Sequence, residues 1–276
     1  MEFKAVALIA RQEITVCSRS RWLAGFAVVF GGLSLAIAYF GSVTAGTAGI
    51  QGFDRTAASL VSLVLYLVPL LGLMLASVHI SSDQAENELL FSQPIARRDI
   101  LYGRLLGMFA TMAGAIAIGF ALSGAVIYSE AGPDGVLRFA AVLVLTFVLS
   151  AVFLAMGAAI GLLSESRVQA LGAALATWFF FVLFYDLAVI GLTFVLRERT
   201  ANNMIFLSLF GNPVGLARVL SLISLSDPSI FGPAGAALLK YLGGAAQAYS
   251  ALVLGLCAWV AAPLLVAARA IRRVDL

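Results

Sequence analysis

The sequence contains few charged residues, two cysteines and one histidine, and each shortage excludes a class of protein. Charged side chains make up 11% of the chain, against about 25% in a soluble domain, so a soluble fold could not cover its surface. Cys17, Cys257 and His79 lie far apart, without the close spacing of a zinc, iron–sulfur or haem site. We therefore expect no metal and no cofactor in this chain, and we interpret the cysteines and His79 as packing residues.

Motifs for chemistry are also missing. The sequence has no G-x-x-x-x-G-K-[ST] phosphate loop. It shows no paired carboxylates and no Ser/His set that would indicate a membrane-embedded enzyme, and we expect no catalytic residue. The two similar halves that are usual in a secondary transporter are not evident either. The net charge of +3 does not suggest a nucleic-acid partner.

Long apolar runs dominate the sequence. Hydrophobic residues make up 62% of the chain, and the mean hydropathy is +1.04. A helix needs about 20 apolar residues to cross the hydrocarbon core of a bilayer. The pattern predicts an all-α membrane protein with one transmembrane domain over residues 1–276 and six spans, at about 22–41, 57–80, 100–128, 136–163, 168–196 and 249–268.

Two further segments flank the predicted spans. Residues 2–17 have the period of an amphipathic helix, which can lie in the membrane surface. Its predicted apolar face holds Phe3, Ala7, Ala10, Ile14 and Cys17, while Lys4, Arg11, Gln12 and Glu13 lie elsewhere. The external segment 197–248 predicts two short interfacial helices, one beginning at Gly211-Asn212-Pro213 and one over Ala236–Leu242 that ends at Gly243-Gly244.

Basic residues and small residues give the orientation and the packing. With the N-terminus inside, eleven of the 17 lysines and arginines fall on the cytoplasmic side and six on the other. The positive-inside rule then predicts a multi-pass membrane protein with both termini cytoplasmic. The pairs Gly103/Gly107 and Gly157/Gly161 have the small-xxx-small spacing of close helix contacts.

A polar stretch separates the second and third predicted spans. Asp83 and Glu86 suit the positive N-terminal end of a short helix, and Pro94 ends it. Arg97 and Arg98 then reach the headgroup level. This order favours a rigid cytoplasmic helix over 83–92, although a solvated loop with a turn at Pro94 has the same pattern.

The residue order in this stretch resembles the coupling segment of type-2 ABC exporter permeases. Glu86-x-Glu88-Leu89-Leu90 is followed by Pro94-Ile95-x-Arg97-Arg98, with Asn87 where the family often has Gly and Arg104 where Lys is usual. The resemblance implies a permease that pairs with a second copy of itself and is driven by a separate ATPase subunit, which binds ATP and Mg. The coupling residues would be Asp83, Glu86, Glu88, Leu89, Leu90, Pro94, Arg97 and Arg98. Such permeases include exporters of drugs, lipids or peptides.

Asp186 stands in an apolar run within the fifth predicted span. A carboxylate in a membrane helix costs about 2.5–3.5 kcal/mol on insertion scales, so it should face the bundle interior or be protonated. Asp186 either lines a substrate path or gate, or bonds to a neighbouring helix near the outer third of its span. Tyr66 and Tyr185 are possible partners.

A narrower resemblance rests on three short motifs. Phe184-Tyr185-Asp186, Gly211-Asn212-Pro213 and Arg218 look like the permeases that serve maturation of nitrous oxide reductase, a copper enzyme. This resemblance implies a role in copper–sulfur site assembly and a periplasmic partner docked on the external segment, at Asn212, Pro213 and Arg218. The alternative for this segment is a simple lid without a partner.

Overall fold

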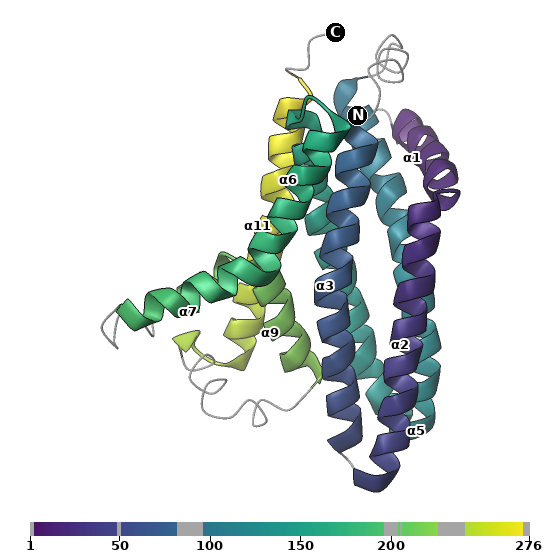
Figure 1. The fold of residues 1–276 in the computed structure, drawn as a ribbon, viewed down its shortest axis with the longest axis vertical. Coiled ribbons are helices and arrows are strands. Elements are labelled where there is room, and N and C mark those ends of the chain that lie inside the picture. Colours follow the sequence, from purple (N-terminus) through teal and green to yellow (C-terminus); the bar gives the residue numbers. More distant parts are fainter. Residues whose placement is uncertain are drawn as a thin grey trace.

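The computed structural model describes residues 3–48, 51–81, 96–195, 204, 206–225 and 241–272, and every element within them is a helix (Figure 1). The bounds are α1 Phe3–Ser18, α2 Arg21–Ala48, α3 Gln51–Ser81, α5 Arg97–Leu163, α6 Arg167–Phe179, the π-helical turn η1 Phe180–Phe184, α7 Tyr185–Val195, α9 Pro213–Leu225 and α11 Ala245–Ala270.

Six stretches of these helices are long and apolar enough to cross a membrane. They are Arg21–Gly41, Thr56–Ser81, Arg97–Tyr128, Leu137–Leu163, Arg167–Phe194 and Ala245–Ala270. The predicted all-α fold with six spans is therefore confirmed. The predicted coupling helix at 83–92 and most of the predicted helix at Ala236–Leu242 lie outside the described residues.

Helix α5 contains two of these spans and folds back on itself. The rings of Phe120 and Phe139 stack with centroids 4.8 Å apart, whereas a straight helix would separate them by about 28 Å. Phe109 and Phe147 also meet, with centroids 6.5 Å apart. The chain therefore reverses between Tyr128 and Leu137, and the two spans of α5 run antiparallel.

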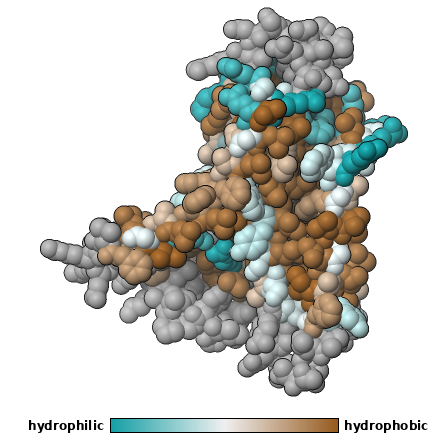
Figure 2. Space-filling model, in the orientation of Figure 1, coloured by the Kyte–Doolittle hydropathy of each residue, from teal (hydrophilic) through white to brown (hydrophobic). Residues whose placement is uncertain are grey.

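The two ends of the molecule differ in polarity. Helix α1 and the C-terminal end of α11 lie at the same end of the molecule (Figure 1). Hydrophilic residues gather at this end, and a broad apolar band follows below it (Figure 2). Large apolar side chains such as Trp22, Val28 and Leu254 are exposed on the outside. An apolar exterior below a polar end is the surface of a multi-pass membrane protein.

Both predicted glycine pairs lie at close helix crossings on α5. A Cβ at Gly157 would come 2.7 Å from the Leu73 carbonyl oxygen of α3, and one at Gly161 would come 2.8 Å from the Ser77 carbonyl. The other pair faces α1, where a Cβ at Gly107 would come 2.5 Å from Cβ of Glu13. The absence of side chains at these positions thus holds α3 and α1 against the same helix.

Helix α1 forms near its predicted bounds, and its buried face shares only Cys17 with the predicted apolar face. Its buried residues are Ala5, Val6, Ile9, Glu13 and Cys17. Phe3 is 83% exposed and Ile14 is also exposed, although both belong to the predicted apolar face. This face of α1 is buried because Gly103 and Gly107 of α5 leave room for Ile9 and Glu13. The stripe with Phe3 and Ile14 is left exposed, and its location in the membrane surface stays a prediction.

Candidate functional site

Two polar clusters stand out among the described residues, and the first joins span five to α9. Asp186 lies in the first turn of α7. Its Oδ2 pairs with Nη1 of Arg218 at 3.1 Å, and its Oδ1 accepts a hydrogen bond of 3.3 Å from Nδ2 of Asn212. We call Asp186, Asn212 and Arg218 the outer network.

Asn212 is the centre of the outer network and is 1% exposed. Its Oδ1 accepts from the backbone N–H of Val214 at 2.9 Å, which caps the start of α9. Its Nδ2 donates to the Phe181 carbonyl at 3.0 Å as well as to Asp186. One amide therefore satisfies the first turn of α9, the π-helical turn and the span-five carboxylate.

The π-helical turn sets the direction of the side chains that follow it. In η1, the N–H of Tyr185 bonds to the carbonyl of Phe180, five residues earlier. Beyond this wider turn, the hydroxyl of Tyr185 donates to the Ser208 carbonyl at 2.6 Å, and Asp186 meets α9. The α6–η1–α7 run bends there, and α7 projects sideways from the bundle (Figure 1).

The outer network joins residues for which separate roles were predicted. Asp186 bonds to a neighbouring helix, which was one of the two alternatives for it. The Tyr185 hydroxyl donates to Ser208. Tyr66 lies outside the outer network, where its backbone carbonyl accepts from Nε1 of Trp178 at 2.9 Å. Asn212 and Pro213 are buried in the described chain, while Arg218 is partly exposed. The docking of a periplasmic partner at these residues stays a prediction.

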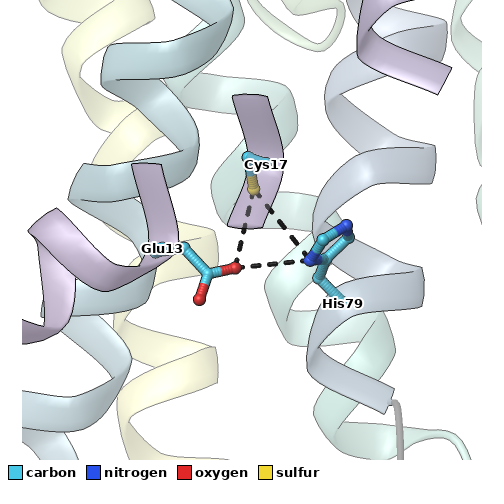
Figure 3. Close-up of side chains that lie close together, drawn as sticks. All are labelled: Glu13, Cys17 and His79. Atoms are coloured by element: carbon cyan, nitrogen blue, oxygen red, sulfur yellow. Dashed lines mark hydrogen bonds and ion pairs between the residues drawn. The ribbon is translucent and has the colours of Figure 1, made fainter. Parts of the chain in front are cut away.

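The second cluster lies at the polar end, where α1 meets α3. Glu13 and Cys17 come from α1 and His79 from α3, and the three side chains point toward one another (Figure 3). The Cys17 thiol donates to Oε1 of Glu13 at 3.6 Å, and Nδ1 of His79 lies 3.3 Å from that oxygen. Sγ of Cys17 lies 4.0 Å from Nδ1 of His79. We call these residues the inner cluster.

The inner cluster is shielded from solvent. Cys17 is fully buried, Glu13 is buried, and His79 is partly buried. Burial and the Glu13 carboxylate raise the pKa of the Cys17 thiol to about 12. Without another ligand the thiol is therefore protonated at neutral pH, as its hydrogen bond to Glu13 requires.

Sequence reasoning missed the inner cluster. Glu13 and Cys17 are four residues apart and so share a helix face, but the predicted polar face separated them. His79 is 62 residues from Cys17, so spacing alone gave no sign of the contact. The available signal was the Glu13-x-x-x-Cys17 spacing, together with the glycines that draw this face of α1 onto α5.

The predicted coupling segment connects two helices whose ends are described. Helix α3 ends at Ser81, two residues after His79, and α5 begins at Arg97. Arg98 is exposed, and Asp99 is buried in the first turn of α5, where a carboxylate suits the helix dipole. Asp83, Glu86, Glu88, Leu89, Leu90 and Pro94 lie outside the described residues.

The profile of the ABC-2 family transporter proteins matches residues 7–276, and this chain belongs to that family. Its class is therefore the membrane-embedded subunit of ABC transporters. A similar protein is the "Probable ABC transporter permease protein NosY" of Pseudomonas aeruginosa, 32% identical over 271 residues, which are 96% of this chain and 97% of the relative. The protein of the same name from Stutzerimonas stutzeri is 32% identical over 273 residues, with the same coverage.

Proposed function

We propose that this chain is the permease of an ABC transporter that serves copper–sulfur site assembly of nitrous oxide reductase. The outer network supports the proposal most directly. The motifs that resemble this group of permeases are far apart in sequence, yet Asp186, Asn212 and Arg218 form one bonded network. They do so in a chain whose named relatives are NosY permeases.

The proposed complex contains two copies of this chain, a NosF-like ATPase that binds ATP and Mg, and a NosD-like periplasmic partner. Span five supports the pairing of two copies. Only 17% of its apolar stretch is buried, against 61% for Thr56–Ser81. On α7, Leu187, Ile190 and Phe194 are exposed on the part that projects from the bundle. A second copy would cover part of this surface.

In the proposed mechanism, the ATPase binds residues 83–92 at the cytoplasmic side of the bacterial inner membrane. The location of α1 and of the end of α11 at the polar end of the molecule supports this orientation. A displacement of a few ångströms in that segment would act first on α3 and α5. Because Gly157 and Gly161 hold α3 tightly against the second span of α5, these two spans should move together.

The proposal is tested in the native host with an affinity-tagged copy of this chain. Purification in mild detergent should recover an ABC ATPase and a periplasmic protein. Deletion of the gene should leave nitrous oxide reductase without its copper–sulfur site, so that cells accumulate nitrous oxide. Recovery of the chain without an ATPase, or a fully matured reductase in the deletion strain, would contradict the proposal.

The coupling role is tested by reversing charge in the predicted coupling segment. The double variant Glu86→Lys/Glu88→Lys should lose ATPase recovery and reductase maturation, because both carboxylates proposed to bind the ATPase become cationic. Glu165→Lys is the control, since Glu165 is an exposed carboxylate in the link between α5 and α6. Normal maturation in the double variant would rule out this segment as the ATPase contact.

A further inference from the structure

The inner cluster brings together the three kinds of side-chain atom that bind zinc in proteins. Zinc lies about 2.3 Å from thiolate sulfur and about 2.0–2.2 Å from imidazole nitrogen and carboxylate oxygen, in tetrahedral sites. Such bonds place the nitrogen and oxygen ligands about 3.4 Å apart, and sulfur about 3.6 Å from either. The observed separations are 3.3 Å for nitrogen to oxygen, 3.6 Å for sulfur to oxygen and 4.0 Å for sulfur to nitrogen.

We propose that Glu13, Cys17 and His79 form a binding site for a zinc-class divalent ion, with a fourth position for water or another ligand. All three candidate ligand atoms lie within 4.8 Å of one another. Only the sulfur–nitrogen separation has to shorten on binding. This proposal replaces the expectation from sequence that the chain holds no metal, and it does not depend on the proposed function.

The backbone around the site is held in place before any ion binds. Glu13 and Cys17 share one face of α1 at a spacing of four residues. Gly107 allows the Ala10 carbonyl and Cβ of Glu13 on α1 to approach α5, and Gly161 allows the same for the Ser77 carbonyl of α3, two residues before His79. The two helices that carry the ligands thus rest on one common helix, which fixes their separation.

The ligand set selects among metal ions. A thiolate disfavours Mg²⁺ and Ca²⁺, which take oxygen ligands. The carboxylate disfavours Cu(I), which prefers soft sulfur ligands. Zn²⁺ accepts all three groups, and Co²⁺ can replace it as a spectroscopic probe. Binding replaces the thiol proton of Cys17 with the metal and releases that proton to solvent.

The position of the site gives it a structural consequence. A bound ion would tie α1 to α3 at His79, close to the end of α3 at Ser81. It would therefore hold the surface helix against the span that leads into residues 82–95. In the structure, Nδ1 of His79 on α3 lies 3.3 Å from Oε1 of Glu13 and 4.0 Å from Sγ of Cys17, both on α1.

The test measures zinc binding to the purified full-length chain after treatment with a chelator. Titration calorimetry and elemental analysis should find one Zn²⁺ per chain. Co²⁺ should give the visible spectrum of a tetrahedral site with a thiolate charge-transfer band. Cys17→Ser, His79→Gln and Glu13→Gln should each weaken zinc binding by at least about tenfold. The thiol control Cys257→Ser, whose thiol is exposed on α11, should bind like the wild type.

Each other result has a definite meaning. Absence of stoichiometric zinc in the wild type, or unchanged binding in Cys17→Ser or His79→Gln, would overturn the proposal. Unchanged binding in Glu13→Gln, with Cu(I) bound in preference to Zn²⁺, would overturn the three-ligand site. A variant that fails to fold is recognised by gel filtration. In that case zinc binding is measured on Cys17→Ala, which removes the ligand and leaves a smaller apolar side chain. Unchanged zinc binding in this variant would overturn the proposal.

Discussion

Asp186 and Glu13 are both carboxylates packed between helices, but their partners differ. Asp186 meets an arginine, which stays charged at any working pH, and a buried asparagine amide. Glu13 meets an imidazole and a thiol, and both can give up a proton. Arg218 already neutralises the Asp186 carboxylate, so a metal ion gains little by binding there. The inner cluster, once deprotonated, offers a nitrogen, a sulfur and an oxygen that can bind a metal ion. The outer network is therefore held by a permanent ion pair, whereas the inner cluster can exchange its thiol proton for a metal ion.

Removal of the arginine should have the largest effect. Arg218→Met leaves Asp186 without its cation inside span five, where a charged side chain costs about 2.5–3.5 kcal/mol, and should lower the free energy of unfolding in detergent by about 3 kcal/mol. The double variant Asp186→Asn/Arg218→Met should recover much of this loss, because no unpaired charge is left. If the double variant is less stable than Arg218→Met, the ion pair is not what stabilises the outer network.

Asn212 separates capping from charge. Asn212→Asp keeps the oxygen that caps α9 but loses both donated bonds and places a second carboxylate beside Asp186. We expect a loss of about 2–3 kcal/mol, although aspartate is by itself as good a cap as asparagine. Asn212→Ser, which caps without the extra charge, should lose less. Thermal unfolding followed by tryptophan fluorescence measures both, and a stabilising Asn212→Asp would contradict the network.

The space at Gly107, where α1 packs against α5, can be filled without changing any of the three proposed zinc ligands. Gly107→Ala places a methyl group against Glu13 and the Ala10 carbonyl, and should cost about 2 kcal/mol and weaken zinc binding by displacing α1. Gly114→Ala is the matched control on the same helix, since its added Cβ meets nothing within 4 Å. This control should be neutral or slightly stabilising. Equal zinc affinity in both variants would show that the docking of α1 does not form the inner cluster.

The smallest effect concerns alkaline pH in the metal-free protein. The thiol pKa of Cys17 is about 12 in the folded chain, against 9.0 for an ordinary thiol. The folded state therefore keeps a proton that the unfolded state loses, so this stabilisation is complete below pH 9 and is lost as the pH rises toward 12. Between pH 8 and 10 the wild type should lose about 1.4 kcal/mol relative to Cys17→Ala. Parallel curves for the two proteins would contradict a buried protonated thiol.

Sequence reasoning reached the features that depend on local pattern. The apolar runs gave the six spans, and the spacing of Gly103/Gly107 and Gly157/Gly161 identified two close helix crossings. The family resemblance followed from short motifs, and the family match confirms it. These features are local because bilayer thickness and helix geometry determine them residue by residue.

Contacts between distant segments could not be read from the pattern. Asp186 and Arg218 are 32 residues apart, and their pairing depends on the π-helical turn and on the cap at Asn212. The side of α1 that packs against α5 was not predicted, because both faces of this helix carry apolar residues and only one of them is buried. The choice between them depends on glycines about 90 residues further along the chain, which a single-helix pattern does not contain.

The contrast between the two clusters is tested most directly by the effect of zinc on thermal stability. Three proteins are compared after removal of metal: the wild type, Asp186→Asn/Arg218→Met and Cys17→Ser. Zinc should raise the Tm of the wild type and of the outer-network variant by the same amount, and should leave the Tm of Cys17→Ser unchanged. An equal rise of the Tm in all three proteins, or no rise in the wild type, would contradict the proposal that the inner cluster is the zinc site.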